Sequence, residues 1–124
     1  MSKKILVVDD EPDVVTYFTA LLEENGYETR SASNGTEAMA AIDADRPDLI
    51  TLDITMPEQS GVKTYRRIKE SDSLKTIPVI IITGVASDFK RFISTRSQVP
   101  APDGYLEKPI QPQTLLDEVA RLLS

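Results

Sequence analysis

Short apolar runs alternate along this chain with longer segments in which apolar residues recur every three or four positions. Three of the runs are four residues long and rich in β-branched side chains: Ile5–Val8, Leu49–Leu52 and Val79–Ile82. Runs of this length and composition are typical of strands that are buried on both faces of a sheet. Two further strands are expected at about 27–32 and 105–107.

The segments between these strands have the spacing of amphipathic helices. The first of them places Val14, Phe18 and Leu22 on one face. Four helical segments are bounded by residues that favour helix ends, namely Pro12 and Gly26, Asn34 and Pro47, Gly61, and Gln111 or Pro112. A further helix is expected to begin near residue 88 and to end before the proline-containing stretch 98–102.

Five strands that alternate with five helices indicate an α/β fold. The strands are then parallel, the crossovers are right-handed, and helices cover both faces of the sheet. With no linker-like or repeated segment, the chain is expected to form one domain over residues 1–124, built as a doubly wound five-stranded parallel sheet. Open sheets of this kind bind ligands beyond the carboxyl ends of their strands.

Polar residues with complementary chemistry stand at those strand ends. Asp9 and Asp10 follow the first strand, and Asp53 follows the third. Thr83 and Lys108 follow the fourth and fifth strands. Carboxylates that face one another at a strand end are costly without a cation. The pattern therefore predicts a site for a cation and a phosphate group.

Composition narrows the chemistry further. The 124 residues include no cysteine and no histidine, which excludes disulfides, thiolate metal sites, histidine ligands and a Ser-His-Asp triad. Any metal must therefore be a hard ion held by oxygen atoms. The net charge of −6 argues against direct binding of nucleic acid, and we interpret the basic group Lys63, Arg66, Arg67 and Lys69 as a solvated helix face. No apolar run has membrane-spanning length and no signal peptide precedes the first strand, so we expect a cytoplasmic protein with no membrane partner.

Four pieces of the sequence, in this order, resemble one known family. They are Ile5–Glu11, Asp53–Pro57 with Gly61, Thr83-Gly84, and Tyr105–Pro109. Together they resemble the receiver (REC) domain of two-component response regulators over essentially the whole chain. The resemblance implies a flavodoxin-like sheet with strand order 2-1-3-4-5.

The resemblance also implies a phosphoacceptor role in a two-component system or phosphorelay. Asp53 would receive a phosphoryl group from a phosphohistidine on a sensor histidine kinase or histidine phosphotransfer protein. Mg²⁺, with Mn²⁺ as the alternative, would be bound directly by Asp10 and Asp53, through water by Asp9, and by the backbone carbonyl of Thr55. Such a domain is a signalling protein that catalyses only its own phosphorylation and slow dephosphorylation, and is not otherwise an enzyme.

The remaining roles implied by the resemblance concern charge neutralisation and switching. Lys108 would neutralise a phosphoryl oxygen, and its bond to Pro109 would be cis. Thr83 would hydrogen-bond the phosphoryl group and leave space into which Tyr105 rotates. This movement would change the surface formed by the fourth helix, fifth strand and fifth helix, which an unidentified downstream protein would bind.

Other interpretations of the same residues remain open at this point. A single Asp at a strand end is most often a cap or turn residue, and an aromatic residue such as Tyr105 most often simply packs. A pseudo-receiver would keep the fold and signal without phosphate. A flavin electron carrier would share the fold class, but the loop Asp10–Asp13 is acidic where a flavin phosphate requires neutral or cationic donors.

The sequence departs from the family pattern between Thr83 and Lys108. This segment is a few residues longer than usual and carries Pro100 and Pro102. We therefore expect phosphorylation chemistry to be kept while the fourth helix and the mode of output differ. We further hypothesise that Thr55 and Val85 make hydrolysis of the phosphoryl group slow. No output domain follows the last helix before Ser124, which leaves either a stand-alone regulator or a piece of a longer chain. We expect the first, because the sequence begins with Met1.

Overall fold

Five parallel strands form one sheet in the order β2–β1–β3–β4–β5. The strands are β1 (Lys4–Val8), β2 (Glu28–Ala32), β3 (Leu49–Asp53), β4 (Val79–Thr83) and β5 (Gly104–Glu107). The computed structural model describes residues 2–55, 60–84 and 102–124. The flavodoxin-like topology expected from the sequence is confirmed.

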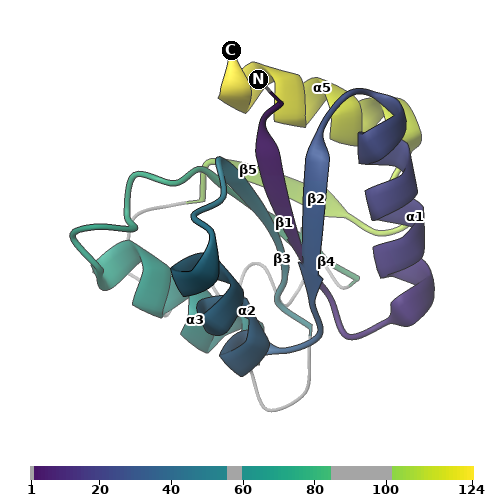
Figure 1. The fold of residues 1–124 in the computed structure, drawn as a ribbon. Coiled ribbons are helices and arrows are strands. Elements are labelled where there is room, and N and C mark those ends of the chain that lie inside the picture. Colours follow the sequence, from purple (N-terminus) through teal and green to yellow (C-terminus); the bar gives the residue numbers. More distant parts are fainter. Residues whose placement is uncertain (1, 56–59, 85–101) are drawn as a thin grey trace.

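Helices cover both faces of the sheet. Figure 1 shows α1 and α5 on one side and α2 and α3 on the other. Their bounds are Pro12–Glu24 for α1, Gly35–Ala44 for α2, Ser60–Glu70 for α3 and Pro112–Leu123 for α5. The further helix expected near residue 88 lies outside the described residues.

The helix ends follow the local chemistry of the sequence. Pro12 occupies the first turn of α1, and Gly26, with φ of 91°, follows the end of that helix in the left-handed conformation that favours glycine. Asn34 caps α2, because its Oδ1 accepts a hydrogen bond of 2.8 Å from the backbone N–H of Glu37. The Glu37 carboxylate in turn accepts a bond of 2.8 Å from the backbone N–H of Ser33. The pair of bonds resembles a capping box, except that Glu37 accepts from Ser33, the residue before the N-cap, and not from Asn34 itself.

Alternate residues of each strand face two separate apolar clusters. In β1, Leu6 and Val8 join the cluster under α2 and α3, whereas Ile5 and Val7 join the cluster under α1 and α5. The strands β1, β3 and β4 are buried on both faces, as their continuous apolar runs indicate. The core therefore holds the carboxyl ends of these three strands at one fixed edge.

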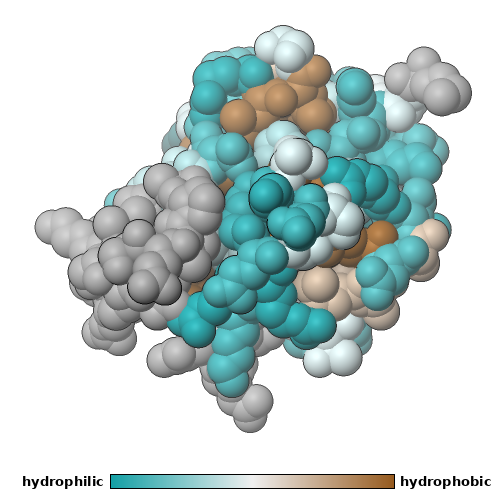
Figure 2. Space-filling view, turned by 90° about the vertical axis from the view of Figure 1, so that its left-hand side faces the viewer, coloured by the Kyte–Doolittle hydropathy of each residue, from teal (hydrophilic) through white to brown (hydrophobic). Residues whose placement is uncertain are grey.

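The expectation that the basic residues of α3 form a solvated helix face is wrong in part. Lys63 and Arg67 are exposed, and Figure 2, which shows the left-hand side of the view in Figure 1, is largely hydrophilic over its coloured area. Lys69, however, is buried, with 5% of its side chain exposed. Its ammonium donates to the backbone carbonyls of Lys75 and Ile77 at 3.2 and 3.1 Å, and to Oδ2 of Asp103 at 3.1 Å. A buried lysine is found where such partners satisfy its charge, and helical spacing alone does not reveal them.

Within the described part of the chain, no helix combines the length and the apolar character needed to cross a membrane.

Candidate functional site at the carboxyl edge of the sheet

The parallel register brings the predicted site residues to one edge of the sheet. Val8 pairs with Leu52, so Asp9 and Asp53 leave neighbouring strands at the same level. Asp53 pairs with Ile82 on the other side. Three buried strands end together at this edge. Side chains separated by more than forty residues in sequence therefore meet here.

Four carboxylates gather at this edge. Asp9, Asp10, Glu11 and Asp53 each offer one oxygen, and these oxygens all lie within 4.8 Å of one another. Asp9 and Asp53 are almost completely buried, with exposed fractions of 2% and 1%, whereas Asp10 and Glu11 are exposed. Carboxylates packed this closely repel one another unless a cation compensates their charge.

Lys108, which follows β5, supplies one positive charge to the cluster. Its Nζ lies 2.8 Å from Oε1 of Glu11, 3.1 Å from Oδ2 of Asp9 and 3.2 Å from Oδ2 of Asp53. Burial by itself lowers the pKa of Lys108, but the hydrogen bond to Glu11 and the charges of Asp53 and Asp9 outweigh burial, so its pKa lies above the ordinary value. The ammonium is therefore charged throughout the physiological range.

Asp53 is held in place by its own loop. Its Oδ1 accepts hydrogen bonds from the backbone N–H of Thr55 at 2.8 Å and from the Thr55 hydroxyl at 2.5 Å. Gly61 of α3 packs directly on the backbone of Asp53 and Ile54. One carboxylate oxygen is thus fixed by the loop, while the other lies within hydrogen-bonding distance of Lys108.

Asp9 has one satisfied and one unsatisfied oxygen. Oδ1 accepts a hydrogen bond of 3.0 Å from the backbone N–H of Glu11. Oδ2 is buried and makes no hydrogen bond within the described structure, although it lies at ion-pair distance from Lys108. Burial raises the pKa of Asp9 to about 6, and the charge of Asp53 adds to this rise, while the Glu11 backbone and Lys108 oppose it. One lysine is thus not enough to compensate this carboxylate fully.

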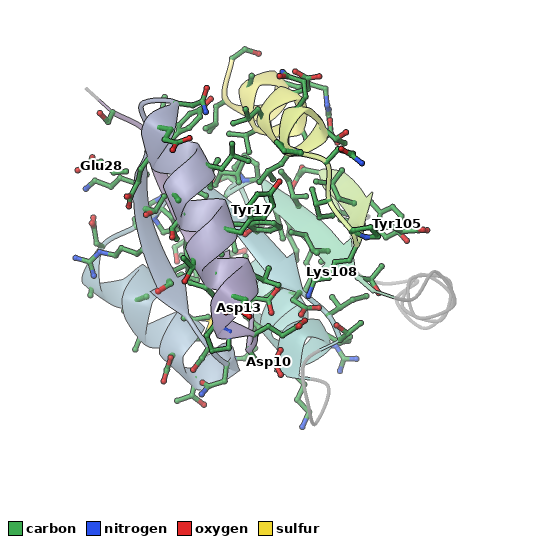
Figure 3. The ribbon with its side chains drawn as sticks, turned by 90° about the vertical axis from the view of Figure 1, so that its right-hand side faces the viewer. Asp10, Asp13, Tyr17, Glu28, Tyr105 and Lys108 are labelled. Atoms are coloured by element: carbon green, nitrogen blue, oxygen red, sulfur yellow. The ribbon has the colours of Figure 1, made fainter. Side chains whose placement is uncertain are left out.

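Thr83 and Tyr105 occupy different parts of this edge. Thr83 is fully buried at the end of β4, and its backbone carbonyl accepts a hydrogen bond of 2.8 Å from the N–H of Lys108. Tyr105 is half-buried on β5 and donates a hydrogen bond of 2.9 Å to Glu107. Figure 3 shows Tyr105 pointing outward from the strand, away from Asp10 and the beginning of α1. The pKa of Tyr105 is raised to about 12 by burial and by the Glu107 contact, so the phenol stays neutral.

Comparison with known proteins now identifies the family. The family model described as the response regulator receiver domain matches residues 5–120. The chain belongs to this family. It is a receiver domain of the two-component response regulators, as the sequence motifs indicate.

Curated relatives and solved structures agree with this assignment. The chain is 33% identical to the polar-differentiation response regulator DivK of Brucella anthropi, over 99% of this chain and 98% of that protein. It is 32% identical to the alkaline phosphatase synthesis transcriptional regulatory protein PhoP of Bacillus subtilis, but spans only 49% of that protein's length. The crystal structure of the signal receiver domain of a Syntrophus aciditrophicus histidine kinase is 35% identical, with a TM-score of 0.87 over 98% of this chain and 90% of that chain.

The residues of this receiver domain fit a hard divalent cation. Carboxylate oxygens are the ligands that Mg²⁺ prefers, and the cluster offers four of them around the buried, unsatisfied Oδ2 of Asp9. Burial is the main cause of the raised pKa of Asp9, and the nearby charge of Asp53 adds to the rise. The donor set of the receiver domain thus agrees with the Mg²⁺ binding that the family generally has.

The cis peptide bond implied by the resemblance is present between Lys108 and Pro109. Two other features of the receiver domain were not predicted as part of the site. Glu11 belongs to a sequence motif but had no predicted role, yet it forms the shortest of the three ion-pair contacts with Lys108. Gly61 was expected as a helix start and as part of the family motif, with no role in the site, yet it allows α3 to approach Asp53. The available signals were an acidic residue next to Asp9-Asp10 for Glu11 and the family motif for Gly61.

Proposed function

We propose that this receiver domain accepts a phosphoryl group on Asp53 from a phosphohistidine of a partner protein. The partner would be a sensor histidine kinase or a histidine phosphotransfer protein. One observation carries the proposal: the buried carboxylate of Asp53 lies 3.2 Å from the ammonium of Lys108, at the edge where Asp9 and Asp10 also end. This arrangement combines a nucleophile with a charge that can neutralise a phosphoryl oxygen.

The proposed reaction is a simple displacement at phosphorus. A carboxylate oxygen of Asp53 forms a bond to phosphorus while the bond from phosphorus to the imidazole nitrogen of the donor breaks. The electron pair of that bond stays on the nitrogen, so the products are an aspartyl phosphate and a free histidine. Phosphoryl transfer of this kind depends mainly on positioning and on charge neutralisation, so the protein needs no histidine of its own.

A bound Mg²⁺ would supply charge neutralisation for the phosphoryl oxygens. In this proposal Asp10 and Asp53 bind it directly, Asp9 acts through water, and the backbone carbonyl of Thr55 completes the protein ligands. The contact between Thr55 and Oδ1 of Asp53 supports the proposal, because it fixes the carboxylate without using its second oxygen. Mn²⁺ is the alternative ion, since carboxylate and water ligands also suit it.

Phosphorylation would then alter the surface around β5. Thr83 would bond the phosphoryl group, and Tyr105 would rotate toward the space that Thr83 leaves. The backbone hydrogen bond between Thr83 and Lys108 supports this coupling, since it ties the ends of β4 and β5 together. The expected helix, residues 98–101 of the proline-containing stretch, and Val85 as a proposed modulator of hydrolysis lie outside the described residues.

The proposal extends to the setting of the protein. It would act in the cytoplasm as a signalling partner of a kinase and of a downstream protein, without itself binding nucleic acid. Its chemistry would be limited to its own phosphorylation and slow dephosphorylation.

Intact mass spectrometry tests the central step. The protein is incubated with acetyl phosphate and Mg²⁺, beside an Asp53→Asn variant that keeps the shape but removes the nucleophile. We expect one added phosphoryl group in the parent, labile to base, and none in the variant. No addition to the parent, under conditions in which an established receiver domain is phosphorylated, would refute the proposal and favour a pseudo-receiver.

A further inference from the structure

Glu11 contacts the same ammonium group as the proposed phosphoacceptor. Its Oε1 lies 2.8 Å from Nζ of Lys108, compared with 3.1 Å for Oδ2 of Asp9 and 3.2 Å for Oδ2 of Asp53. A lysine ammonium carries three N–H donors. Glu11 and Asp53 accept hydrogen bonds from the ammonium, and the buried Asp9 carboxylate lies at ion-pair distance from it. The oxygen of an arriving phosphoryl group therefore has to compete with these carboxylates for Lys108.

The three carboxylates differ in how readily they can give up this contact. The side chains of Asp9 and Asp53 are 2% and 1% exposed, so before the phosphoryl group is transferred either would be left charged and poorly solvated without the ammonium. The Glu11 side chain is 60% exposed, and water can take the place of the ammonium around it at little cost. Glu11 is therefore the partner that can leave.

We propose that Glu11 is a positioning residue that holds Lys108 in the resting protein and gives up its place on the ammonium to a phosphoryl oxygen. The inference rests on the proposed function, because it requires a phosphoryl group on Asp53. On phosphorylation the Glu11 carboxylate turns to water, while Lys108 stays beside the buried carboxylate of Asp9 and the phosphoryl group on Asp53. Glu11 thus orients the ammonium before the reaction and competes with the phosphoryl group during it.

Release of Glu11 also changes a surface outside the carboxylate cluster. Glu11 and Lys108 line a groove between α1 and the segment that follows β5, together with Val14, Tyr17 and Ile110. Figure 3 shows Lys108 and Tyr17 on the side of the molecule that carries α1. The phosphorylated protein therefore presents a free carboxylate at the edge of this groove, where the resting protein presents an ion pair.

The first turn of α1 offers a matched control. Asp13 is exposed, lies two residues after Glu11, and forms no ion pair with Lys108 among the described residues. Glu11→Gln and Asp13→Asn each remove one negative charge near the beginning of the same helix. They share any effect of net charge and helix dipole. A difference in phosphorylation rate between the two variants therefore measures the effect of the Glu11 contact with Lys108.

The first measurement compares phosphorylation rates. The parent, Glu11→Gln and Asp13→Asn proteins are incubated with subsaturating acetyl phosphate and Mg²⁺, and uptake is followed by intact mass. We expect Glu11→Gln to react about threefold to tenfold faster than Asp13→Asn, the factor that corresponds to one partly exposed ion pair. Equal rates, or a slower reaction of Glu11→Gln, would overturn the inference, since Glu11 would then be neutral or would assist the reaction.

A second measurement tests whether Glu11 acts through Lys108. Urea unfolding of the unphosphorylated proteins is compared for Glu11→Gln, Lys108→Met and the double variant. We expect Glu11→Gln to lower the midpoint in the parent background and to have no such effect in the Lys108→Met background. Additive effects of the two substitutions would show that the contact does not hold Lys108.

These outcomes separate the inference from the proposed function. If the parent and Asp13→Asn proteins are phosphorylated and Glu11→Gln matches them, the inference alone fails. If the parent takes up no phosphoryl group, the proposed function fails, and the inference with it.

Discussion

Gly61 packs directly against the backbone of Asp53. A Cβ atom at position 61 would overlap the carbonyl oxygen of Asp53 and would lie 2.7 Å from Cα of Ile54. Because these are backbone atoms at the end of a buried strand, they cannot move aside as a flexible side chain could. The absence of a side chain at Gly61 thus sets how closely α3 approaches the proposed phosphoacceptor.

Gly61→Ala should therefore disturb both stability and phosphorylation. We expect a loss of about 1–3 kcal/mol in unfolding free energy, the usual cost of overpacking, and slower uptake of phosphoryl groups from acetyl phosphate because Asp53 is displaced. Urea denaturation and intact mass measure the two effects. Lys63→Ala is the control, since Lys63 is exposed on the same helix. Wild-type stability and rate in Gly61→Ala would contradict the packing argument.

Because Asp9 is buried, we expect its effect on the free energy of unfolding to depend on pH. Its pKa rises from 3.8 to about 6 on folding, so its contribution to stability is present below pH 4 and is lost as the pH rises through about 6. Without added metal, Asp9→Asn should therefore be more stable than the parent at pH 7, by up to about 3 kcal/mol. The difference should shrink as the pH approaches 4. Denaturation series across this range test the prediction, and a difference that does not change with pH would refute it.

Mg²⁺ should stabilise the parent against unfolding. At a concentration ten times its dissociation constant, the ion adds about 1.4 kcal/mol to the unfolding free energy if it binds only the folded state. We expect the melting temperature to rise with Mg²⁺ in the parent and in Asp13→Asn, and to rise much less in Asp10→Asn. Thermal denaturation with and without the ion measures this, and an equal rise in all three proteins would argue against the proposed ligands.

Thr51 carries a polar group in an apolar layer. It is 1% exposed, its hydroxyl finds no hydrogen-bond partner within the described structure, and its register neighbour in β1 is Val7. Thr51→Val removes the unsatisfied hydroxyl while nearly keeping the shape, so it should stabilise the protein by about 1 kcal/mol or more. The reciprocal change Val7→Thr should destabilise it by a similar amount. Urea unfolding compares the two, and a less stable Thr51→Val protein would show that the hydroxyl is satisfied.

The ion pair of Lys69 with Asp103 should contribute far more to the unfolding free energy than an exposed ion pair does. Asp103 Oδ2 accepts hydrogen bonds from Lys69 at 3.1 Å and from the backbone N–H of Val79 at 2.9 Å, and the Lys69 side chain is only 5% exposed. Asp103→Ala leaves a buried charge and a backbone donor unpaired, so we expect a loss of about 2 kcal/mol, less than for a fully buried pair because Asp103 is partly exposed.

The control for this prediction is Asp72→Ala. Asp72 pairs with Lys75 on the surface, where the two side chains are 99% and 52% exposed. We expect almost no change in its unfolding free energy. Equal losses in Asp103→Ala and Asp72→Ala would mean that Lys69 does not depend on its carboxylate partner.

The apolar pattern and a few special residues were enough to predict a doubly wound parallel sheet, while the strand order followed from the family resemblance. Runs such as Ile5–Val8 are short, β-branched and continuous, and only a strand covered on both faces buries them fully. Local chemistry also predicted the helix beginnings at Pro12 and Asn34, because a proline in the first turn or a capping side chain acts within a few residues. The meeting of Asp9 with Asp53 followed from parallel strands that end at one edge.

Only the tertiary structure decided which groups touch and how deeply each is buried. Lys69 was expected in solvent, but it is buried because carbonyls and Asp103 from distant segments converge on it. Glu11 reaches Lys108 across 97 residues of sequence, and Gly61 meets the Asp53 backbone through the placement of α3. The spacing of apolar residues predicts which face of a helix or strand is apolar, because that face is set by residues close together in the sequence. Contact distances depend instead on how separate elements pack, and no local pattern encodes them.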